Sequence, residues 1–166
     1  MKCWRMLEMS SARMVSLDTS TNKSGCALFI HGNLEEYNLI DLSKMGLDLD
    51  TRINEMGRQL IGMLNHWKPS MVFIEEPKGH QNIELVRKLS EVLGIIRGWC
   101  IQNGAYYGEI KPSEWRKYCG LDQGGKKRVE LKAASVEYVK TKYGIEVNDD
   151  TADAICIGDA VVNRYK

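Results

Sequence analysis

The segment Met14–Ile30, MVSLDTSTNKSGCALFI, decides the fold because it contains two strand patterns joined by a short polar turn. The first apolar run ends on the acid Asp18, and the second, SGCALFI, continues to HGN at 31–33, which is typical of a tight turn. A third strand pattern, EEYNLIDL, occupies 35–42. The chain is therefore expected to open with three antiparallel strands and to present a carboxylate where the first one ends.

The rest of the chain alternates helix and strand patterns. Apolar residues that recur every three or four positions predict helices, and continuous apolar runs predict strands. The expected elements are a helix at 51–67, a strand at 71–77, a helix at 82–102, a strand at 105–110, a short helix from Pro112, and helices at 127–143 and 150–165. Pro112 suits an early helical position, with Ser113 or the preceding turn as cap. Hairpins followed by βα crossovers predict an α/β fold, a mixed sheet with helices packed on it.

Length and composition indicate a single domain. The 166 residues contain no internal repeat or linker-like tract, so we expect one domain over 14–166, preceded by an N-terminal extension at 1–13. No apolar run reaches the roughly 18–20 residues that span a bilayer, so no membrane segment is expected. The five cysteines are odd in number and contain no CxxC pair, which argues against a disulfide framework or a zinc site and favours a reducing compartment.

Charge is unevenly distributed, although the formal net charge is only +1. Between Lys111 and Lys142 there are nine Lys or Arg residues and four acids, so this part of the chain is locally basic. A basic region on a nearly neutral protein can bind a polyanion without making the whole surface bind polyanions non-specifically. For each basic residue the alternative is an ordinary solvated helix face.

Two groups of acids stand at strand ends, and each has a plain structural alternative. Asp18 ends the first strand, where an acid can simply start a turn. Glu75 and Glu76 end the fourth strand. Because successive strand residues point to opposite faces, only one of this pair can join a given site, and a solvated loop is the alternative for the other.

A third group of acids opens the last helix, where Asp149 or Asp150 can act as an N-cap. Capping does not account for Asp153, which lies one turn further along on the same face as Asp150. Acids at two strand ends and at a helix start can converge at one sheet edge, where their mutual repulsion requires a cation. Oxygen ligands without His or Cys favour Mg²⁺ or Mn²⁺, and two such ions about 3.5–4 Å apart are usual for phosphodiester hydrolysis.

In order and spacing, these motifs resemble the RuvC family of Holliday-junction resolvases, in the ribonuclease H-like superfamily. The motifs are Asp18 with Gly25 seven residues later, Ile74-Glu75 closing the fourth strand, Lys111-Pro112-Ser113 opening a basic helix, and D-x-x-D-A at Asp150–Ala154. A single D-x-x-D is weak support, whereas four motifs in order are specific. The resemblance runs from about Met14 to Lys166, and short, divergent members of this kind look similar to those of bacteriophages.

The resemblance implies a five-stranded mixed sheet in the order 3-2-1-4-5, flanked by helices. It implies a crossover junction endodeoxyribonuclease that resolves four-way junctions by paired nicks, leaves 5′-phosphate ends and uses two Mg²⁺ ions per active site, with Mn²⁺ as a substitute. Carried over by motif, the metal ligands and catalytic acids are Asp18, Glu75, Asp150 and Asp153, with Asp149 as an alternative to Asp150. The implied location is the cytoplasm of a bacterial or phage-infected cell.

The same resemblance assigns roles to basic residues. Lys127, or its neighbour Lys126, is expected to assist catalysis by stabilising the phosphate or positioning the water. The expected DNA contacts are Lys111, Ser113, Arg116, Lys117, Lys126 and Arg128.

The helix at 82–102 is the expected homodimer interface. Its apolar stripe is wider than one core-facing side needs, since Leu85, Ile95 and Trp99 lie partly off the main seam. The family forms dimers through this helix, and two sites related by a dyad match the approximate symmetry of a four-way junction. Plain core packing is the alternative.

One departure from the family follows Glu75. Many members have an aromatic or apolar residue there that opens the junction centre, whereas this chain has Lys78 and His80. A broader nuclease for forks, flaps and other branched DNA is therefore an alternative, as is an enzyme that cuts RNA/DNA hybrids. LDTSTNKSGCAL also resembles the phosphate-binding hairpin of the actin/hexokinase-like ATP-binding superfamily, whose members usually need two related domains. A non-catalytic DNA-binding relative would lack carboxylates that are all present here.

Overall fold

The computed structural model describes residues 12–77, 83–121 and 127–164. In chain order the elements are β1 (Arg13–Asp18), β2 (Lys23–Ile30), β3 (Asn33–Asp41), α2 (Leu49–Trp67), β4 (Met71–Glu75), α3 (Ile83–Asn103), β5 (Tyr106–Ile110), α4 (Pro112–Tyr118), α5 (Arg128–Tyr143) and α6 (Asp149–Arg164). This order is the predicted one, with boundaries that differ by a residue or two. Residues 1–11 of the predicted N-terminal extension lie outside the description, while Ala12 is already buried.

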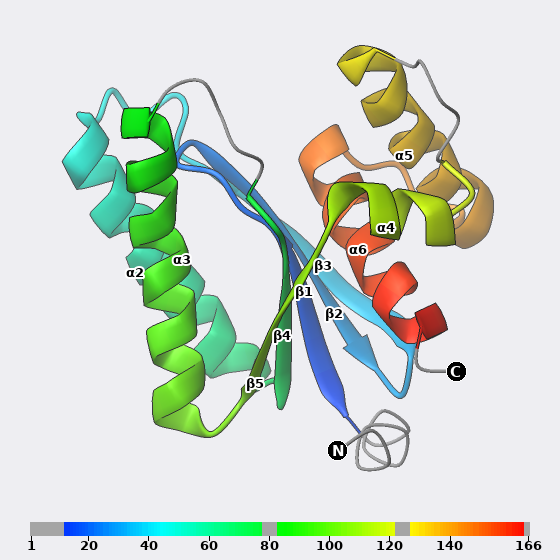
Figure 1. The fold of residues 1–166 in the computed structure, drawn as a ribbon, viewed down its shortest axis with the longest axis horizontal. Helices are drawn as coiled ribbons and strands as arrows, with labels where there is room; N and C mark the ends of the chain where they lie inside the picture. The colour runs from blue at the N-terminus through cyan, green and yellow to red at the C-terminus, as the bar shows by residue number, and fades with distance from the viewer. Residues whose placement is uncertain (1–11, 78–82, 122–126, 165–166) are drawn as a thin grey trace.

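The five strands form one mixed sheet in the order β3-β2-β1-β4-β5 (Figure 1). β1, β2 and β3 pair antiparallel, β4 runs parallel to β1, and β5 runs parallel to β4. His31 and Gly32 take positive φ values of 53° and 78° in the turn between β2 and β3, where the HGN motif predicts a tight turn. The predicted fold class and strand order are thereby confirmed.

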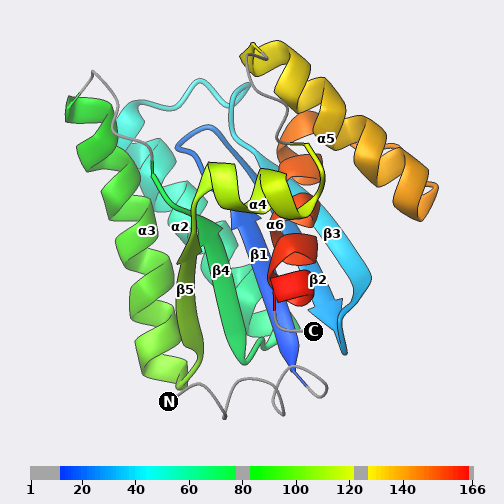
Figure 2. The ribbon, with the colours of Figure 1, turned by 45° about the vertical axis from the view of Figure 1, so that its right-hand side comes forward.

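Helices cover both faces of the sheet (Figures 1 and 2). α2 and α3 pack together on one face, whereas α6 lies across β1 and β2 on the other. α4 and α5 both pack on α6, and Figure 2 shows α5 on the outer side of α6. The sheet is thus enclosed between a two-helix layer and a layer built around α6.

Period-two alternation along the strands determines which face each acid joins. In β1, Met14 belongs to the core beneath α6 and Val15 to the core beneath α2 and α3. The same alternation places Asp18 on the α6 face. In β4, Phe73 belongs to the α6 core, so Glu75 is the member of the acid pair that faces α6.

The structure corrects the prediction for two residues of α3. Trp99 is only 7% exposed, and its indole N–H donates to Asn65 of α2 at 2.8 Å, so it lies between the two helices. Ile95 is partly buried against Gly57 of α2, where an added Cβ would come within 2.6 Å of its side chain. Of the three residues predicted to lie off the core-facing seam, Leu85 is the one that is exposed, at 42%.

Candidate active site

Asp18 ends β1 without serving as the turn former. The hydroxyl of Ser20 donates to the carbonyl of Lys23 at 2.6 Å and accepts hydrogen bonds from the backbone N–H groups of Asn22 and Lys23. Ser20 therefore fills the structural role that was the alternative for Asp18. The carboxylate of Asp18 is left at the end of the strand, on the α6 face.

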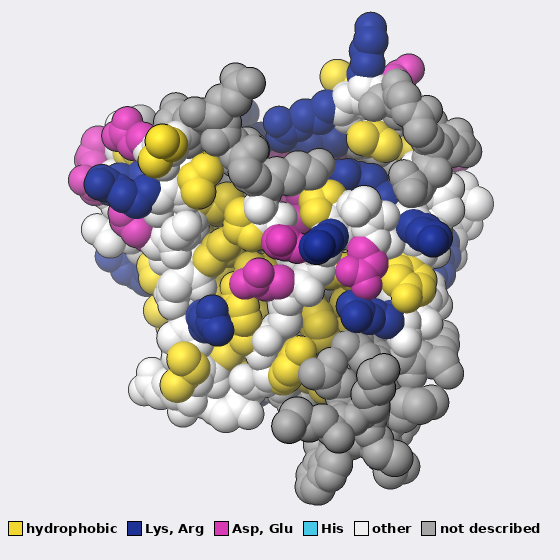
Figure 3. Space-filling model, in the orientation of Figure 1, with side chains coloured by type: hydrophobic (Ala, Val, Ile, Leu, Met, Phe, Trp, Pro, Cys, Tyr) yellow, Lys and Arg dark blue, Asp and Glu magenta, His cyan; other side chains and the backbone are white. Residues whose placement is uncertain are grey.

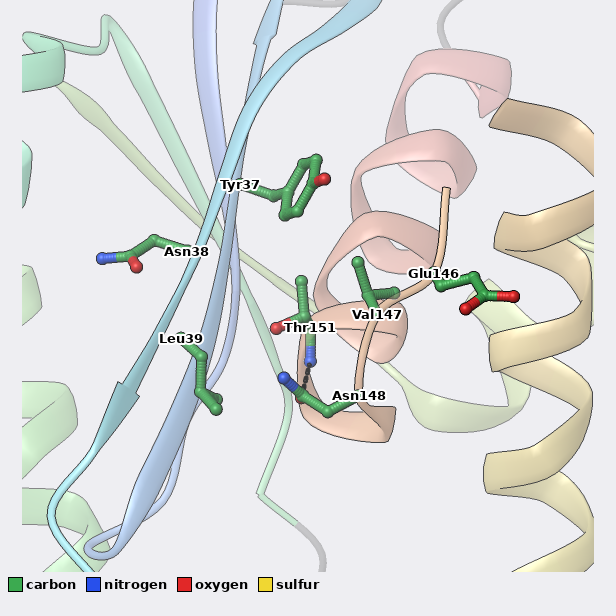
Figure 4. Close-up of a pocket in the computed structure, with 7 residues that line it drawn as sticks. All are labelled: Tyr37, Asn38, Leu39, Glu146, Val147, Asn148 and Thr151. Atoms are coloured by element: carbon green, nitrogen blue, oxygen red, sulfur yellow. Dashed lines mark hydrogen bonds between the residues drawn. The ribbon is translucent and has the colours of Figure 1, made fainter. Parts of the chain in front are cut away.

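The start of α6 has a separate cap as well. The side chain of Asn148 accepts a hydrogen bond from the N–H of Thr151 at 2.9 Å, and its carbonyl accepts the N–H of Ala152 (Figure 4). The alternative that Asp149 or Asp150 is the N-cap is therefore wrong. Both acids follow the cap, in the first turn of the helix.

Close backbone packing brings the start of α6 to the end of β1. Gly25 of β2 is paired with Asp18, and a Cβ added to Gly25 would lie 1.9 Å from the carbonyl oxygen of Asp150. One turn deeper, the hydroxyl of Ser16 donates to the carbonyl of Ala154 at 2.7 Å. The spacing of Asp18 and Gly25 in the sequence thus has a physical reason, because a side chain at Gly25 would push α6 away from the strand-end acid.

Glu75 is held by α4. The indole N–H of Trp115, a fully buried residue, donates to Glu75 Oε2 at 2.7 Å. The guanidinium of Arg116 stacks over the Trp115 ring, 4.4 Å from its centroid, and lies 4.0 Å from the same carboxylate oxygen. The helix predicted to contact DNA therefore also positions one of the predicted metal ligands.

The four predicted acids interact electrostatically. Burial raises the pKa of Asp18 well above its usual value, and the charges of Asp153, Glu75 and Asp150 raise it further. Burial likewise raises the pKa of Asp153 to about 6. The charges of the four acids therefore act on Asp18, and Asp18 and Asp153 both lie in desolvated surroundings.

Lys132 of α5 contacts the acids at the start of α6, and the sequence did not single it out. Its amine lies 2.5 Å from a carboxylate oxygen of Asp149 and 3.0 Å from one of Asp150. Partial burial opposes the charged amine, but the hydrogen bonds to both acids outweigh this effect and raise the pKa of Lys132. Lys127, the predicted catalytic lysine, is the exposed N-cap residue of α5, and its backbone N–H donates to Glu130.

The donor chemistry of this cluster fits a hard divalent cation. Asp153 is only 5% exposed, and its Oδ1 has no hydrogen-bond partner among the described residues. A buried carboxylate oxygen without a partner is costly, and a metal ion is a natural partner for it. Within the same residues, however, no group of three His, Cys, Asp or Glu side chains is arranged around one metal position. Lys132 and Trp115 instead hold oxygens of Asp150 and Glu75.

The predicted DNA contacts differ in exposure. Lys111, Ser113, Lys117 and Arg128 are exposed on α4, on its N-cap and at the start of α5, whereas Arg116 is half-buried and turned toward Glu75. Lys126 lies outside the described residues, as do Lys78 and His80. Figure 3 shows acidic side chains at the centre of this face with Lys and Arg side chains beside them. The face thus combines positive and negative charge.

A groove of about 460 Å³ lies on another side of α6, between β3 and the approach to the helix. Its lining residues are Tyr37, Asn38, Leu39, Glu146, Val147, Asn148 and Thr151 (Figure 4). These include no Lys or Arg, so the groove is poorly suited to a phosphate backbone. The exposed basic residues of α4 and α5 are better suited to nucleic acid.

Comparison with known proteins places these features in a class. No protein-family model matches the chain. The crossover junction endodeoxyribonuclease RuvC of Nitratidesulfovibrio vulgaris (strain DP4) is 23% identical over 150 residues, which cover 89% of this chain and 90% of the relative. Among solved structures, T. thermophilus RuvC in complex with a Holliday junction substrate matches with a TM-score of 0.72 at 15% identity, covering 91% and 93% of the two chains.

A viral resolvase has the same fold. The fowlpox virus resolvase, solved with Holliday junction DNA, matches with a TM-score of 0.62 at 15% identity, over 92% of this chain and 97% of the other. The chain therefore has the ribonuclease H-like fold of these resolvase structures. Within that class, the chain is similar to RuvC-type Holliday-junction resolvases in both sequence and fold, as its motifs predict. The expected enzyme class, a crossover junction endodeoxyribonuclease, is supported by the same relatives.

Proposed function

We propose that this protein is a divalent-metal-dependent endonuclease that resolves four-way DNA junctions by paired nicks. The observation that supports the proposal is that Asp153, Glu75 and Asp150 act electrostatically on Asp18 at the α6 face of the sheet, with Oδ1 of Asp153 buried and lacking a hydrogen-bond partner among the described residues. The proposed substrate class is supported by relatives that are named crossover junction endodeoxyribonucleases and by neighbours solved with Holliday junctions.

The four acids would hold two Mg²⁺ or Mn²⁺ ions. Bound divalent ions supply an activated water and stabilise charge on the departing oxygen. The side chains have their own tasks: Trp115 orients Glu75 through the indole N–H, and the α6 backbone holds Asp150 and Asp153 one turn apart. Lys127 or Lys126 remains the proposed phosphate-stabilising lysine.

DNA binding is assigned to α4, its N-cap and the start of α5. The exposed Lys111, Lys117 and Arg128 are suited to phosphate oxygens, and Ser113 can donate its hydroxyl. Arg116 contributes its positive charge close to Glu75, at the boundary between the DNA-binding surface and the acids.

Dimerisation through α3 has support from small residues on its exposed side. Gly94 and Gly98 are exposed, and a Cβ added to either would meet no atom within 4 Å. Ile101, three residues after Gly98 and 76% exposed, continues the same side of the helix. A second copy of α3 can therefore approach closely along this stripe, and Ile101 would be covered on association.

A charge on this stripe tests the dimer. Gly98→Glu is expected to shift the protein from dimer to monomer while leaving the folded monomer intact. The new side chain has room in an isolated copy but not between two associated copies. Analytical ultracentrifugation provides the measurement. The matched control is Gly62→Glu on α2, which is equally exposed and open, and should stay dimeric. Dimerisation of both variants would exclude this face as the interface.

The function is tested with a labelled synthetic four-way junction in Mg²⁺ or in EDTA, beside a matched linear duplex, a fork, a flap and an RNA/DNA hybrid. Paired nicks in opposed junction strands, with Mg²⁺ only, are the expected result. Equal cutting of forks and flaps would assign the broader branched-DNA activity, and preference for the hybrid would replace the junction as substrate. Absence of cleavage, combined with ATP binding in calorimetry, would favour the actin/hexokinase-like alternative.

A further inference from the structure

Two lysines of α5 each pair with acids of α6, in different surroundings. Lys142, near the end of α5, lies 2.9 Å from Asp159, which also accepts a hydrogen bond from the hydroxyl of Tyr143 at 2.6 Å. The Lys142 amine further lies over the rings of Tyr138 and Tyr143. The rings of Tyr138 and Tyr143 flank the Lys142 amine, and the pair joins α5 to α6.

Lys132 pairs with two carboxylates, whereas Lys142 pairs with one. The Lys132 amine bridges Asp149 and Asp150 at the start of α6. The side chain of Lys132 is 26% exposed and that of Asp150 is 19% exposed, so water screens this interaction only in part.

A gathering of carboxylates needs positive charge to be stable. Lys132 supplies one unit of positive charge at the start of α6, where Asp150 is a proposed metal ligand. The amine occupies Oδ1 of Asp150, and its positive charge repels a cation that approaches either oxygen, so the two cations compete at Asp150. Asp149, one residue earlier and not needed as helix cap, gives the amine a second carboxylate on which to remain.

We propose that Lys132 is an internal counter-ion that competes with divalent cations for the carboxylate of Asp150, with Asp149 as its alternative anchor. The proposal rests on the metal site of the proposed function. It makes Lys132 a positioning residue that sets the affinity for the metal ion at Asp150. Without metal, the amine keeps the acids neutralised. Metal binding releases the amine from Asp150. Because the two cations compete, removing the amine should strengthen metal binding by the factor by which the amine contact had weakened it.

The test measures Mn²⁺ binding to the full chain without DNA, by electron paramagnetic resonance of the free ion. Lys132→Met is expected to lower the Kd for Mn²⁺ about fivefold or more, the lower end of typical coupling between two sites. Lys132→Gln, which is also neutral but polar, should act in the same direction. Lys132→Arg keeps the charge and should stay close to wild type. Lys142→Met, the matched control on the same helix, should loosen α5 without changing the Kd.

A second readout separates this role from a purely structural one. In EDTA, Lys132→Met is expected to lower the unfolding temperature, because the acids lose their counter-ion, and saturating Mn²⁺ should largely remove that difference. Binding with an unchanged or higher Kd in both neutral variants would overturn the counter-ion role and leave the metal site intact. Failure of the wild type and of both neutral variants to bind Mn²⁺ would overturn the metal site as well.

Discussion

The two faces of the sheet differ in what they bury. Beneath α2 and α3 the core is apolar apart from Ser24 of β2, with Leu60, Leu64 and Ile96 among the residues with no exposed surface. Beneath α6 the core also holds buried polar groups: Ser16, Ser135, Thr151, Asp153 and Asp159. One face stabilises the fold, and the other tolerates costly polar groups because they are held in specific contacts.

This difference teaches where function is located in the domain. A buried acid costs free energy unless it finds a partner, whereas an apolar core residue is stabilising by itself. On the α6 face the compensation comes from close backbone packing at Gly25 and from lysines of α5. Substitutions on the α6 face should therefore affect activity more than stability, and substitutions on the α2–α3 face should do the reverse.

The largest effect is expected for Asp153→Asn. Cleavage of a four-way junction in single-turnover assays should fall by more than roughly 100-fold. Loss of a group that only supports a metal ligand can cost that much, and Asp153 is itself a proposed ligand. The unfolding temperature in EDTA should stay the same or rise, because the change removes a charge from a buried carboxylate whose Oδ1 has no hydrogen-bond partner among the described residues. DNA binding should be retained. Cleavage at the wild-type rate would remove Asp153 from the metal site.

The opposite result is expected for Leu60→Ala in α2. Leu60 has no exposed surface, and truncating a buried Leu typically costs about 2–5 kcal/mol of stability. Urea unfolding should show this loss, while the cleavage rate per folded molecule stays at the wild-type value. A large loss of cleavage in the folded variant would contradict the division between the two faces.

An intermediate effect is expected for Trp115→Phe, which removes the hydrogen bond to Glu75 and keeps an aromatic ring. Cleavage should fall by about tenfold, the lower range for loss of a group that orients a metal ligand. The matched control is Trp99→Phe, which removes a similar hydrogen bond to Asn65 on the other face and should leave cleavage unchanged. Equal losses of cleavage in both variants would indicate general destabilisation.

The smallest effect concerns the pH dependence of stability at the cap of α2. The side chain and backbone N–H of Thr51 donate to the carboxylate of Asp48 and lower the pKa of Asp48 below its ordinary value of 3.8. Because the pKa of Asp48 is lower in the folded than in the unfolded state, its ionised carboxylate stabilises the protein at pH values above the unfolded-state pKa. This stabilisation is lost as the pH falls through the folded-state pKa. Wild type should therefore lose stability relative to Asp48→Asn in urea unfolding below about pH 4. A constant difference would contradict the shift.

Much of the fold was predictable because its signals are local. Strand alternation, helical periodicity and the HGN turn are properties of neighbouring residues, and they predicted the element order that the structure shows. The four acids were also found from local motifs, since each stands at the end of a strand or at the start of a helix. The spacing of Asp18 and Gly25 was visible as a motif, although its reason is a contact with Asp150, which lies far away in the sequence.

The partners of those acids were decided by the tertiary structure alone. Trp115 and Glu75 are 40 residues apart, and Lys132 lies 17 and 18 residues from Asp149 and Asp150, so no helical or strand period relates them. Their contacts depend on how α4 and α5 pack on α6. The sequence by itself determined the elements and the acids at their ends, because backbone preference and periodicity are local. Only packing determined which side chain neutralises or orients each acid, because electrostatic and hydrogen-bonding partners are chosen by distance in space.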